Sequence, residues 1–233
     1  MQDFDFIVVG AGSSGSVLAG RLSEDANVRV LLLEAGPPDD SIWIHLPIGY
    51  GKTMWDKTYN WCFETDPDPN MNHRRIYWPR GKTLGGSSSI NGLIYIRGQR
   101  EDYDHWKALG NEGWGYDDVL SYFRRSERNQ RGADAFHGDQ GPLHVSDIGA
   151  KHELIEAFIA GAEENGVPRT PDFNGAQQEG AGYYQLTTLK GWRCSTAQAY
   201  LKPARHRSNL VIRTRAQATR LLFEGKRVVG VQY

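Results

Sequence analysis

The chain has 233 residues, of which 39% are hydrophobic, enough for the core of one domain or of one domain with a sub-domain. Its 27 basic and 28 acidic residues nearly cancel, so its charge gives no reason to expect a nucleic acid or an anionic membrane as partner. No stretch approaches the roughly 20 apolar residues of a membrane-spanning helix. Two cysteines and an acidic start without an apolar signal region favour a cytoplasmic location.

The first part of the chain predicts a strand, a helix and a second strand. Phe4–Val9 is mostly apolar, and Val28–Leu33 is almost continuously so, which is typical of a parallel sheet covered on both faces. Between them, residues 13–24 carry apolar side chains at helical spacing, with Ser13 or Ser14 as the expected N-cap. The predicted fold class is therefore α/β, with a Rossmann-like, mostly parallel sheet.

Three glycines stand where the first strand meets the helix. Gly10, Gly12 and Gly15 form G-x-G-x-x-G, in which the first permits a sharp turn, the second lets a pyrophosphate approach and the third lets helix and strand pack closely. Glu34 ends the second strand, where a carboxylate can accept hydrogen bonds from ribose hydroxyls. The pattern predicts a site for the ADP half of a dinucleotide and leaves FAD and NAD open. The competing interpretation is a glycine-rich turn beside a surface glutamate.

The rest of the chain alternates irregular and periodic segments. Residues 37–80 are rich in aromatics and prolines, and a long irregular stretch of this kind is usually functional, so we expect it to form a cofactor lid. Gly81–Asn91 is rich in glycine and serine. Further helices are expected at 101–109, 116–125, 152–165 (closed by Gly166) and 195–201 (ending before Pro203), and a hairpin is expected among 210–212, 218–223 and 228–233 with its turn at 224–226.

One long segment carries a family resemblance. Trp78–Gly98, which reads WPRGKTLGGSSSINGLIYIRG, closely resembles the first signature of the glucose-methanol-choline (GMC) flavin oxidoreductases. The stretches Glu34–Gly36, Asn60–Phe63, Tyr103–Trp106 and Arg193–Ala197 are similar to the same family in the same order. The resemblance covers essentially the whole chain and implies FAD as the cofactor.

The resemblance also implies roles for particular residues. The backbone of Asn91–Ile94 would lie against the flavin, the loop near Gly85 would cover the pyrophosphate, and Ala218 would meet the adenine through its backbone. Some relatives attach FAD through a histidine at the position of Ile90, so isoleucine predicts a non-covalent cofactor. Small and neutral residues at 81–92 suit close approach of a flat, polar-edged cofactor. The cofactor-binding candidates are Gly10, Gly12, Ser13, Ser14, Gly15, Glu34, Ala35, Trp61, Arg80, Gly85, Ser88, Asn91, Gly92, Leu93, Ile94 and Ala218.

The family pattern predicts how the chain is divided. Residues 1–100 and 191–233 would form the FAD-binding domain, and residues 101–190 would begin an α+β substrate-binding domain inserted between them. Family members are considerably longer, and their catalytic histidine, paired with a second histidine or an asparagine, lies near the C-terminus. We therefore expect a chain truncated at residue 233, without a catalytic residue of its own, whose partner is the complementary C-terminal half. None of its seven histidines has a zinc-ligand spacing with a partner, so no metal is expected.

The implied activity is oxidation of a primary alcohol by hydride transfer to flavin N5, in which the flavin does the chemistry and the protein orients and shields it. Three alternatives stay open: a fatty-acid photodecarboxylase of the same fold, an NAD-binding dehydrogenase suggested by the glycine fingerprint alone, and a dinucleotide-binding module without turnover. Flavin absorption bands, light-dependent release of CO₂ and complementation by the second half would discriminate among them.

Overall fold

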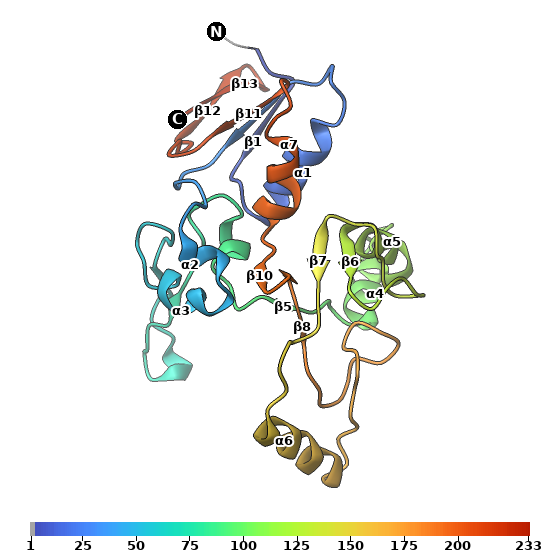
Figure 1. The fold of residues 1–233 in the computed structure, drawn as a ribbon. Helices are drawn as coiled ribbons and strands as arrows, with labels where there is room; N and C mark the ends of the chain where they lie inside the picture. Colours follow the sequence, from blue (N-terminus) through green and yellow to red (C-terminus); the bar gives the residue numbers. More distant parts are fainter. Residues whose placement is uncertain (1–2) are drawn as a thin grey trace. The chain divides into compact units, whose positions relative to one another are not determined.

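The computed structural model describes residues 3–233, which form two compact units. The first unit runs to Gly92 and resumes from Trp192 to Tyr233, and the second unit spans Leu93–Gly191. In Figure 1 the blue start and the red end of the chain contribute to the same unit. The second unit is therefore an insertion in the sequence of the first.

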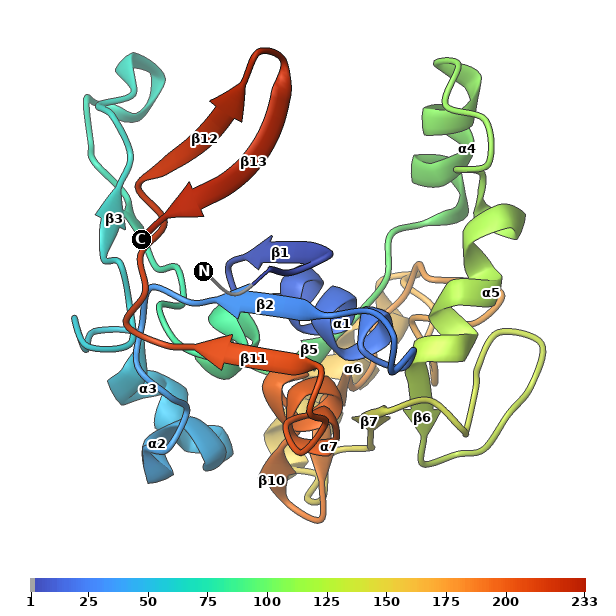
Figure 2. The same cartoon turned by 90° about the horizontal axis from the view of Figure 1, so that it is seen from above.

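A parallel sheet carries the first unit. Its three strands are β1 (Phe6–Val9), β2 (Val30–Leu33) and β11 (Leu210–Arg213), with β2 in the middle, and they lie side by side in Figure 2. The predicted βαβ unit is confirmed, because α1 (Ser13–Leu22) connects β1 to β2. All four residues of β2 are buried, as expected for a continuously apolar strand in a covered parallel sheet. The predicted α/β class with a Rossmann-like sheet is confirmed.

Helices pack on this sheet through small and aliphatic side chains. Ala19 of α1 and Leu32 of β2 share one buried cluster with Leu201, which lies in the π-helical segment Ala197–Leu201. Gly20 lets α1 approach that segment, because an added Cβ would come within 3.2 Å of Tyr200. Each fully buried leucine of this kind stabilises the fold by roughly 1.5–3 kcal/mol.

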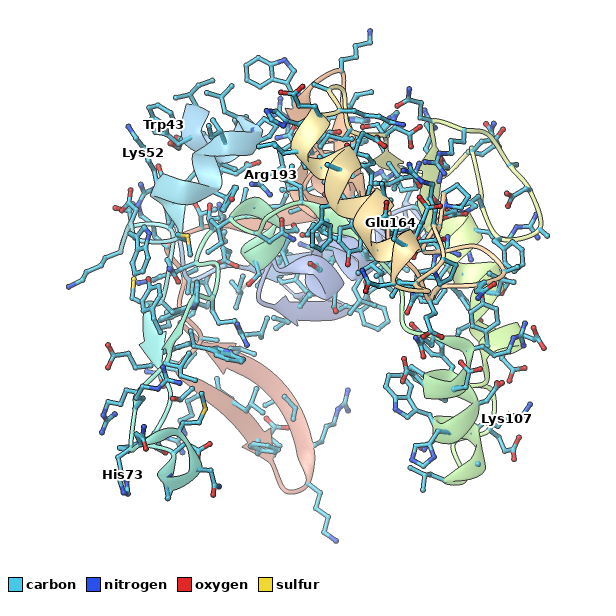
Figure 3. All side chains as sticks on the ribbon, turned by 90° about the horizontal axis from the view of Figure 1, so that it is seen from below. Trp43, Lys52, His73, Lys107, Glu164 and Arg193 are labelled. Atoms are coloured by element: carbon cyan, nitrogen blue, oxygen red, sulfur yellow. The ribbon has the colours of Figure 1, made fainter. Side chains whose placement is uncertain are left out.

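The segment 37–80, expected to be irregular, contains several short elements. Some of its hydrogen bonds reach remote parts of the chain: the carbonyl of Ile44 accepts one from Arg193, and the carboxylate of Asp39 accepts one from Gln198. Lys52 holds its ammonium 3.7 Å from the ring centroid of Trp43 (Figure 3). Asn60, which is 2% exposed, connects Met54 with Tyr77 and Arg80 through the hydrogen bonds described below. The elements are α2 (Ile42–His45), α3 (Tyr50–Thr53), the antiparallel pair β3 (Phe63–Glu64) and β4 (Tyr77–Trp78), and 3₁₀ turns at Pro47–Gly49 and Pro69–Met71.

The second unit has three helices near their predicted positions. The helix α6 (Glu153–Glu164) has Asn165 as its C-cap. Gly166 follows with φ +84°, the left-handed conformation predicted for the residue that closes this helix. The elements are α4 (Arg100–Ala108), α5 (Tyr116–Ser126), α6 (Glu153–Glu164), and the strands β5 (Ile94–Tyr95), β6 (Glu127–Asn129), β7 (Leu143–Val145), β8 (Gln185–Leu186) and β9 (Thr188–Leu189).

Two predicted helix ends were wrong. The N-cap of α1 is Gly12, while Ser13 and Ser14 both lie inside the helix, and no side chain caps it. The predicted stop before Pro203 is also wrong, because the π-helical segment continues into α7 (Lys202–Ala204). Pro203 is the second residue of α7, so the helical run passes through the proline that was expected to end it.

The last 25 residues combine a confirmed prediction with a correction. β12 (Arg220–Glu224) and β13 (Arg227–Gln232) form the predicted antiparallel hairpin. Residues 210–212 do not join that hairpin, because they belong to β11 and pair in parallel with β2.

The strand β10 (Trp192–Arg193) precedes the π-helical segment. Within residues 3–233, no helix has both the length and the apolar character needed to cross a bilayer.

Candidate functional site

A cavity opens at the carboxyl ends of the parallel strands in the first unit. Its volume is about 690 Å³, within the range of roughly 300–1,000 Å³ typical of small-molecule sites. In open α/β sheets, ligands bind outside the carboxyl ends of the strands. We call it the strand-end cavity, and its lining residues are Val9, Gly10, Gly12, Ser13, Leu33, Glu34, Ala35, Trp61, Phe63, Arg80, Gly81, Gly86, Ser87, Ala216, Gln217 and Ala218.

The three glycines of the fingerprint have three different reasons to be glycine. Gly10 has φ +91°, a backbone conformation that other residues rarely adopt. An added Cβ at Gly15 would collide with the carbonyl oxygen of Gly10, so helix and strand pack here without a side chain. At Gly12, φ is −69° and an added Cβ would meet no protein atom within 4 Å. Since neither backbone nor packing requires glycine at position 12, the reason that remains is close approach of a ligand.

The N-terminus of α1 faces this site without a capping side chain. Gly12 is the N-cap and Ser13, the first helical residue, lines the strand-end cavity. The first backbone N–H groups of a helix have no acceptor within it, and together with the helix dipole they attract an anion. A serine N-cap would have consumed one of these donors. The corrected position of the cap therefore suits a site for a pyrophosphate.

Glu34 connects the end of β2 to the glycine turn. One of its carboxylate oxygens accepts a hydrogen bond from the N–H of Ala11, and the other accepts one from the N–H of Gly36, both at 2.8 Å. Burial raises the pKa of Glu34, and the hydrogen bonds from Gly36 and Ala11 oppose that rise. A carboxylate has about four acceptor positions, so further hydrogen bonds from ligand hydroxyls remain possible.

A loop of glycines and serines forms another side of the strand-end cavity. We call Gly81–Asn91 the glycine-serine loop. Gly85 donates its N–H to the carbonyl of Ala11 at 2.7 Å, which attaches the loop to the glycine turn. Gly86 has φ +53° and packs so closely that an added Cβ would lie 2.6 Å from Cα of Gly12. Glycine at position 86 is therefore needed both for the turn and for the contact.

The serine side chains of the loop hold it in place. Ser88 donates its hydroxyl to the carbonyl of Gly85 at 2.6 Å and accepts a hydrogen bond from the N–H of Thr196 at 3.0 Å. Ser89 donates its hydroxyl to Leu84 at 2.6 Å. The bond with Thr196 attaches the loop to the residue that precedes the π-helical segment, and the other two bonds brace the loop internally.

Aromatic and basic side chains approach the cavity from residues 60–82. The ring of Trp61 stacks on that of Phe63 with centroids 5.8 Å apart, and the ammonium of Lys82 lies 4.6 Å from the Trp61 centroid. Asn60 positions this group, because its side-chain oxygen accepts the N–H of Cys62 at 3.0 Å and that of Arg80 at 2.8 Å. Its amide nitrogen donates to the carbonyl of Met54 and to the hydroxyl of Tyr77.

The structure brings half of the sequence-predicted cofactor residues to this one cavity. Ser14 and Gly15 lie in α1 without lining it, Gly85 and Ser88 hold the loop beside it, and Asn91 with Gly92 ends that loop. Leu93 and Ile94 belong to the second unit. The predicted residues that line the cavity are Gly10, Gly12, Ser13, Glu34, Ala35, Trp61, Arg80 and Ala218.

Sequence reasoning missed several lining residues. Phe63 lies two residues after Trp61, and Ala216 and Gln217 directly precede Ala218, so these three positions could have been inferred from their neighbours in the sequence. Val9 and Leu33 are the last residues of their strands. Among the described residues 3–233, no group of three or more histidine, cysteine, aspartate or glutamate side chains is placed to hold a metal ion.

The sequence of the chain matches one protein family over nearly its whole length. The model of the GMC oxidoreductase family matches residues 4–233. The chain belongs to this family. The resemblance inferred from Trp78–Gly98 and the other stretches is thereby confirmed.

Relatives within the GMC family match the chain over its full length. It is 49% identical to the mitochondrial choline dehydrogenase of Mus musculus, covering all of this chain and 40% of that protein. It is 51% identical to the oxygen-dependent choline dehydrogenase of Yersinia pestis, covering all of this chain and 42% of the other. It is 48% identical to an alcohol dehydrogenase (acceptor) of Pseudomonas putida, with 99% and 42% covered. The chain therefore spans about two fifths of the length of these relatives.

Two solved oxidoreductase structures share the fold. Pyridoxine 4-oxidase from Mesorbium loti superposes with a TM-score of 0.94 at 34% identity, covering 98% of this chain and 45% of that one. An FAD-dependent oxidoreductase from Chaetomium thermophilum gives a TM-score of 0.90 at 29% identity, covering 98% and 41%. The fold of this chain is thus shared with oxidoreductases of known structure, one of which is described as FAD-dependent.

Proposed function

We propose that this chain forms the FAD-binding part of a GMC flavoenzyme that oxidises a primary alcohol. The observation that carries the proposal is Gly12, which lines the strand-end cavity although nothing in the protein itself requires glycine there. The names of the relatives support the substrate class, since those described above are choline and alcohol dehydrogenases. We propose an alcohol-bearing small molecule as the substrate, with choline as the first candidate.

The residues around the cavity fit FAD. The uncapped N-terminus of α1 at Ser13 suits the pyrophosphate, and Glu34 suits the ribose hydroxyls. Ala218 borders the same cavity and suits the adenine, because its short side chain leaves the backbone accessible. Ile90, which is 4% exposed, has no nucleophilic atom, and this supports a non-covalent cofactor.

Bound FAD would supply the hydride acceptor for alcohol oxidation. The residues of this chain contribute binding, orientation and exclusion of water. Trp61 and Phe63 cover the cavity with apolar rings, and Asn60 holds them in place through the backbone of Cys62. We assign no catalytic base to residues 3–233, and we propose that the base comes from the complementary C-terminal half.

The two compact units support separate roles in binding the cofactor and the substrate. We propose that the first unit is the FAD-binding domain, because it contains the whole strand-end cavity. The second unit, Leu93–Gly191, would begin the substrate-binding domain. Cys62 and Cys194 form no disulfide, which supports a reducing compartment such as the cytoplasm. Fractionation of cells that produce the protein would test this location.

Purification of the full-length protein tests the proposal directly. We expect flavin absorption bands that acid precipitation removes from the protein, and bleaching of these bands by choline or another primary alcohol under anaerobic conditions. Colour that stays with the precipitate would contradict the non-covalent cofactor. Binding of NAD without any flavin would instead favour the nicotinamide alternative. Release of CO₂ from a fatty acid only under blue light would favour the photodecarboxylase.

A further inference from the structure

Arg193 is a buried arginine behind the glycine-serine loop in the first unit. Its side chain is labelled in Figure 3, and the residue is 3% exposed. Its guanidinium donates to the carbonyl of Ile44 at 2.7 Å, to the carbonyl of Ser88 at 3.1 Å, and to both the side-chain and the main-chain oxygen of Asn91 at 2.8 Å. Four hydrogen bonds therefore join three segments of the chain, and every acceptor is a neutral oxygen.

The charge of Arg193 has no carboxylate partner among the described residues, in contrast to the other deeply buried arginine. Arg97 places Nη2 2.5 Å from Oε2 of Glu127, with side-chain exposures of 2% and 0%. No ion pair found within residues 3–233 includes Arg193. Burial lowers the pKa of Arg193 to about 10, so the group remains charged at neutral pH. An unpaired buried charge costs several kcal/mol, which suggests that this one has a use.

The position of Arg193 connects it to the strand-end cavity. Ser87, which lines the cavity, directly precedes Ser88, whose carbonyl accepts from Arg193. Gly92 directly follows Asn91, and an added Cβ at Gly92 would meet no protein atom within 4 Å. As at Gly12, the protein itself does not require glycine there. Arg193 thus holds Ser88 and Asn91, which lie between the cavity-lining Ser87 and the unobstructed Gly92.

We propose that Arg193 is a positioning residue for bound flavin, and that its fixed positive charge raises the reduction potential of that flavin. This inference rests on the proposed function, because it requires FAD at the strand-end cavity. Reduction adds negative charge to a flavin, and a cation in a low-dielectric interior favours the more negative state. The hydrogen bonds to Ser88 and Asn91 also keep the loop in the conformation that receives the cofactor.

Two substitutions separate the charge from the hydrogen bonds. Asn91→Asp keeps an oxygen where Nη1 donates but gives Arg193 a carboxylate partner, so we expect a lower reduction potential with FAD still bound. Arg193→Lys keeps the charge but loses the planar set of donors, so we expect FAD affinity to fall by about tenfold or more while the potential stays close to wild type. Arg193→Gln removes both properties, and we expect it to lower both quantities.

The control variant is Arg207→Gln. Arg207 also donates to a backbone carbonyl in the first unit, to Gly20 at 2.6 Å, and it does not line the strand-end cavity. The experiment measures FAD dissociation constants by fluorescence and flavin potentials by equilibration with reference dyes, on the full-length protein. Arg207→Gln should lower the melting temperature and leave both quantities unchanged.

The outcomes distinguish the possible failures. Unchanged potentials in FAD-bound Asn91→Asp and Arg193→Gln would overturn the role of the charge, and if Arg193→Gln does not fold, Asn91→Asp alone decides. Equal FAD affinity in Arg193→Lys and wild type would overturn the positioning role. An equal shift of potential in Arg207→Gln would mean general loosening and would also overturn the proposal. A wild-type protein that binds no FAD at all would contradict the proposed function instead.

Discussion

The imidazole of His137 places Nε2 2.8 Å from a carboxylate oxygen of Asp172, while its Nδ1 lies 2.9 Å from Glu127. Burial acts to lower the pKa of His137, but the hydrogen bonds to Asp172 and Glu127 outweigh it and raise the pKa to about 9. The same contact with His137 helps to hold the pKa of Asp172 below its usual range, against the effect of burial. This ion triplet joins three separate segments of the second unit.

Because the folded pKa of His137 exceeds its ordinary value of 6.5, its charge stabilises the second unit fully below pH 6.5, and that stability is lost as the pH rises through 9. We expect a loss of up to about 3 kcal/mol, measured by denaturant unfolding between pH 6 and pH 9.5. His137→Gln should be less stable at pH 6 and lack this loss. His144→Gln is the control, since burial lowers the pKa of His144; a pH profile that responds equally to both variants would contradict the assignment.

The glycine fingerprint predicts opposite behaviour for two alanine variants. Gly12→Ala should leave the melting temperature nearly unchanged, because its Cβ meets no protein atom, but it should reduce FAD affinity by about tenfold or more through contact with the cofactor. Gly15→Ala should destabilise the first unit by about 1–3 kcal/mol, because its Cβ collides with the carbonyl of Gly10. Thermal melts without FAD and FAD titrations of both variants measure these effects. Normal FAD affinity in Gly12→Ala would show that the cavity is not used as proposed.

Asn60 should control the conformation of the aromatic side of the cavity. Asn60→Ala removes acceptors from the N–H groups of Cys62 and Arg80, so we expect a stability loss of about 2–4 kcal/mol and faster proteolysis of residues 54–82. Asn60→Asp keeps these acceptors but places a buried carboxylate oxygen against the carbonyl of Met54, so we expect a stability loss at least as large, with the N–H groups of Cys62 and Arg80 still bonded. Limited proteolysis followed by mass spectrometry locates the cleavage. Cleavage at the same rate in Asn60→Ala and wild type would refute this role.

Glu34 should matter to both the turn and the cofactor. Glu34→Gln places an amide NH₂ group opposite one of the two N–H donors, Ala11 or Gly36, so we expect a loss of about 1–3 kcal/mol in stability. FAD should bind more weakly as well, because the amide has fewer acceptors for ribose hydroxyls. Unfolding curves with and without FAD separate the two effects. An unchanged stabilisation by FAD in this variant would mean that Glu34 serves the turn alone.

The local pattern was sufficient to predict the first βαβ unit. The continuously apolar segment predicts the buried strand β2, and the glycine fingerprint predicts the turn from β1 into α1. The N-cap was not predictable from the same text. Ser13 and Ser14 are good caps, but the turn at Gly10 brings the helix to begin at Ser13, and this leaves its first N–H groups uncapped. The preference for serine as an N-cap therefore gave the wrong cap at the helix end whose free N–H groups face the cavity.

Other features depend on partners that are remote in sequence. Residues 210–212 were predicted to join the hairpin because they stand near its two strands in the sequence. Their pairing with β2 is a tertiary contact that the local pattern does not contain. Asn60 and Arg193 both lie in stretches that resemble the family, but the resemblance does not say what either side chain contacts. That Asn60 positions the segment of Trp61 and Phe63, and that Arg193 is buried behind the glycine-serine loop, are tertiary contacts seen only in the structure.

The central strand of the parallel sheet in the first unit pairs with one neighbour that is synthesised much later than itself. β2 ends at Leu33 and its partner β11 begins only at Leu210, after the whole inserted unit. On the ribosome, one edge of β2 must stay uncovered while the intervening residues emerge, and such an edge can pair with other chains. Synthesis that pauses before Leu210 should therefore leave nascent chains that depend on chaperones, whereas chains from which residues 210–213 have emerged can pair β11 with β2.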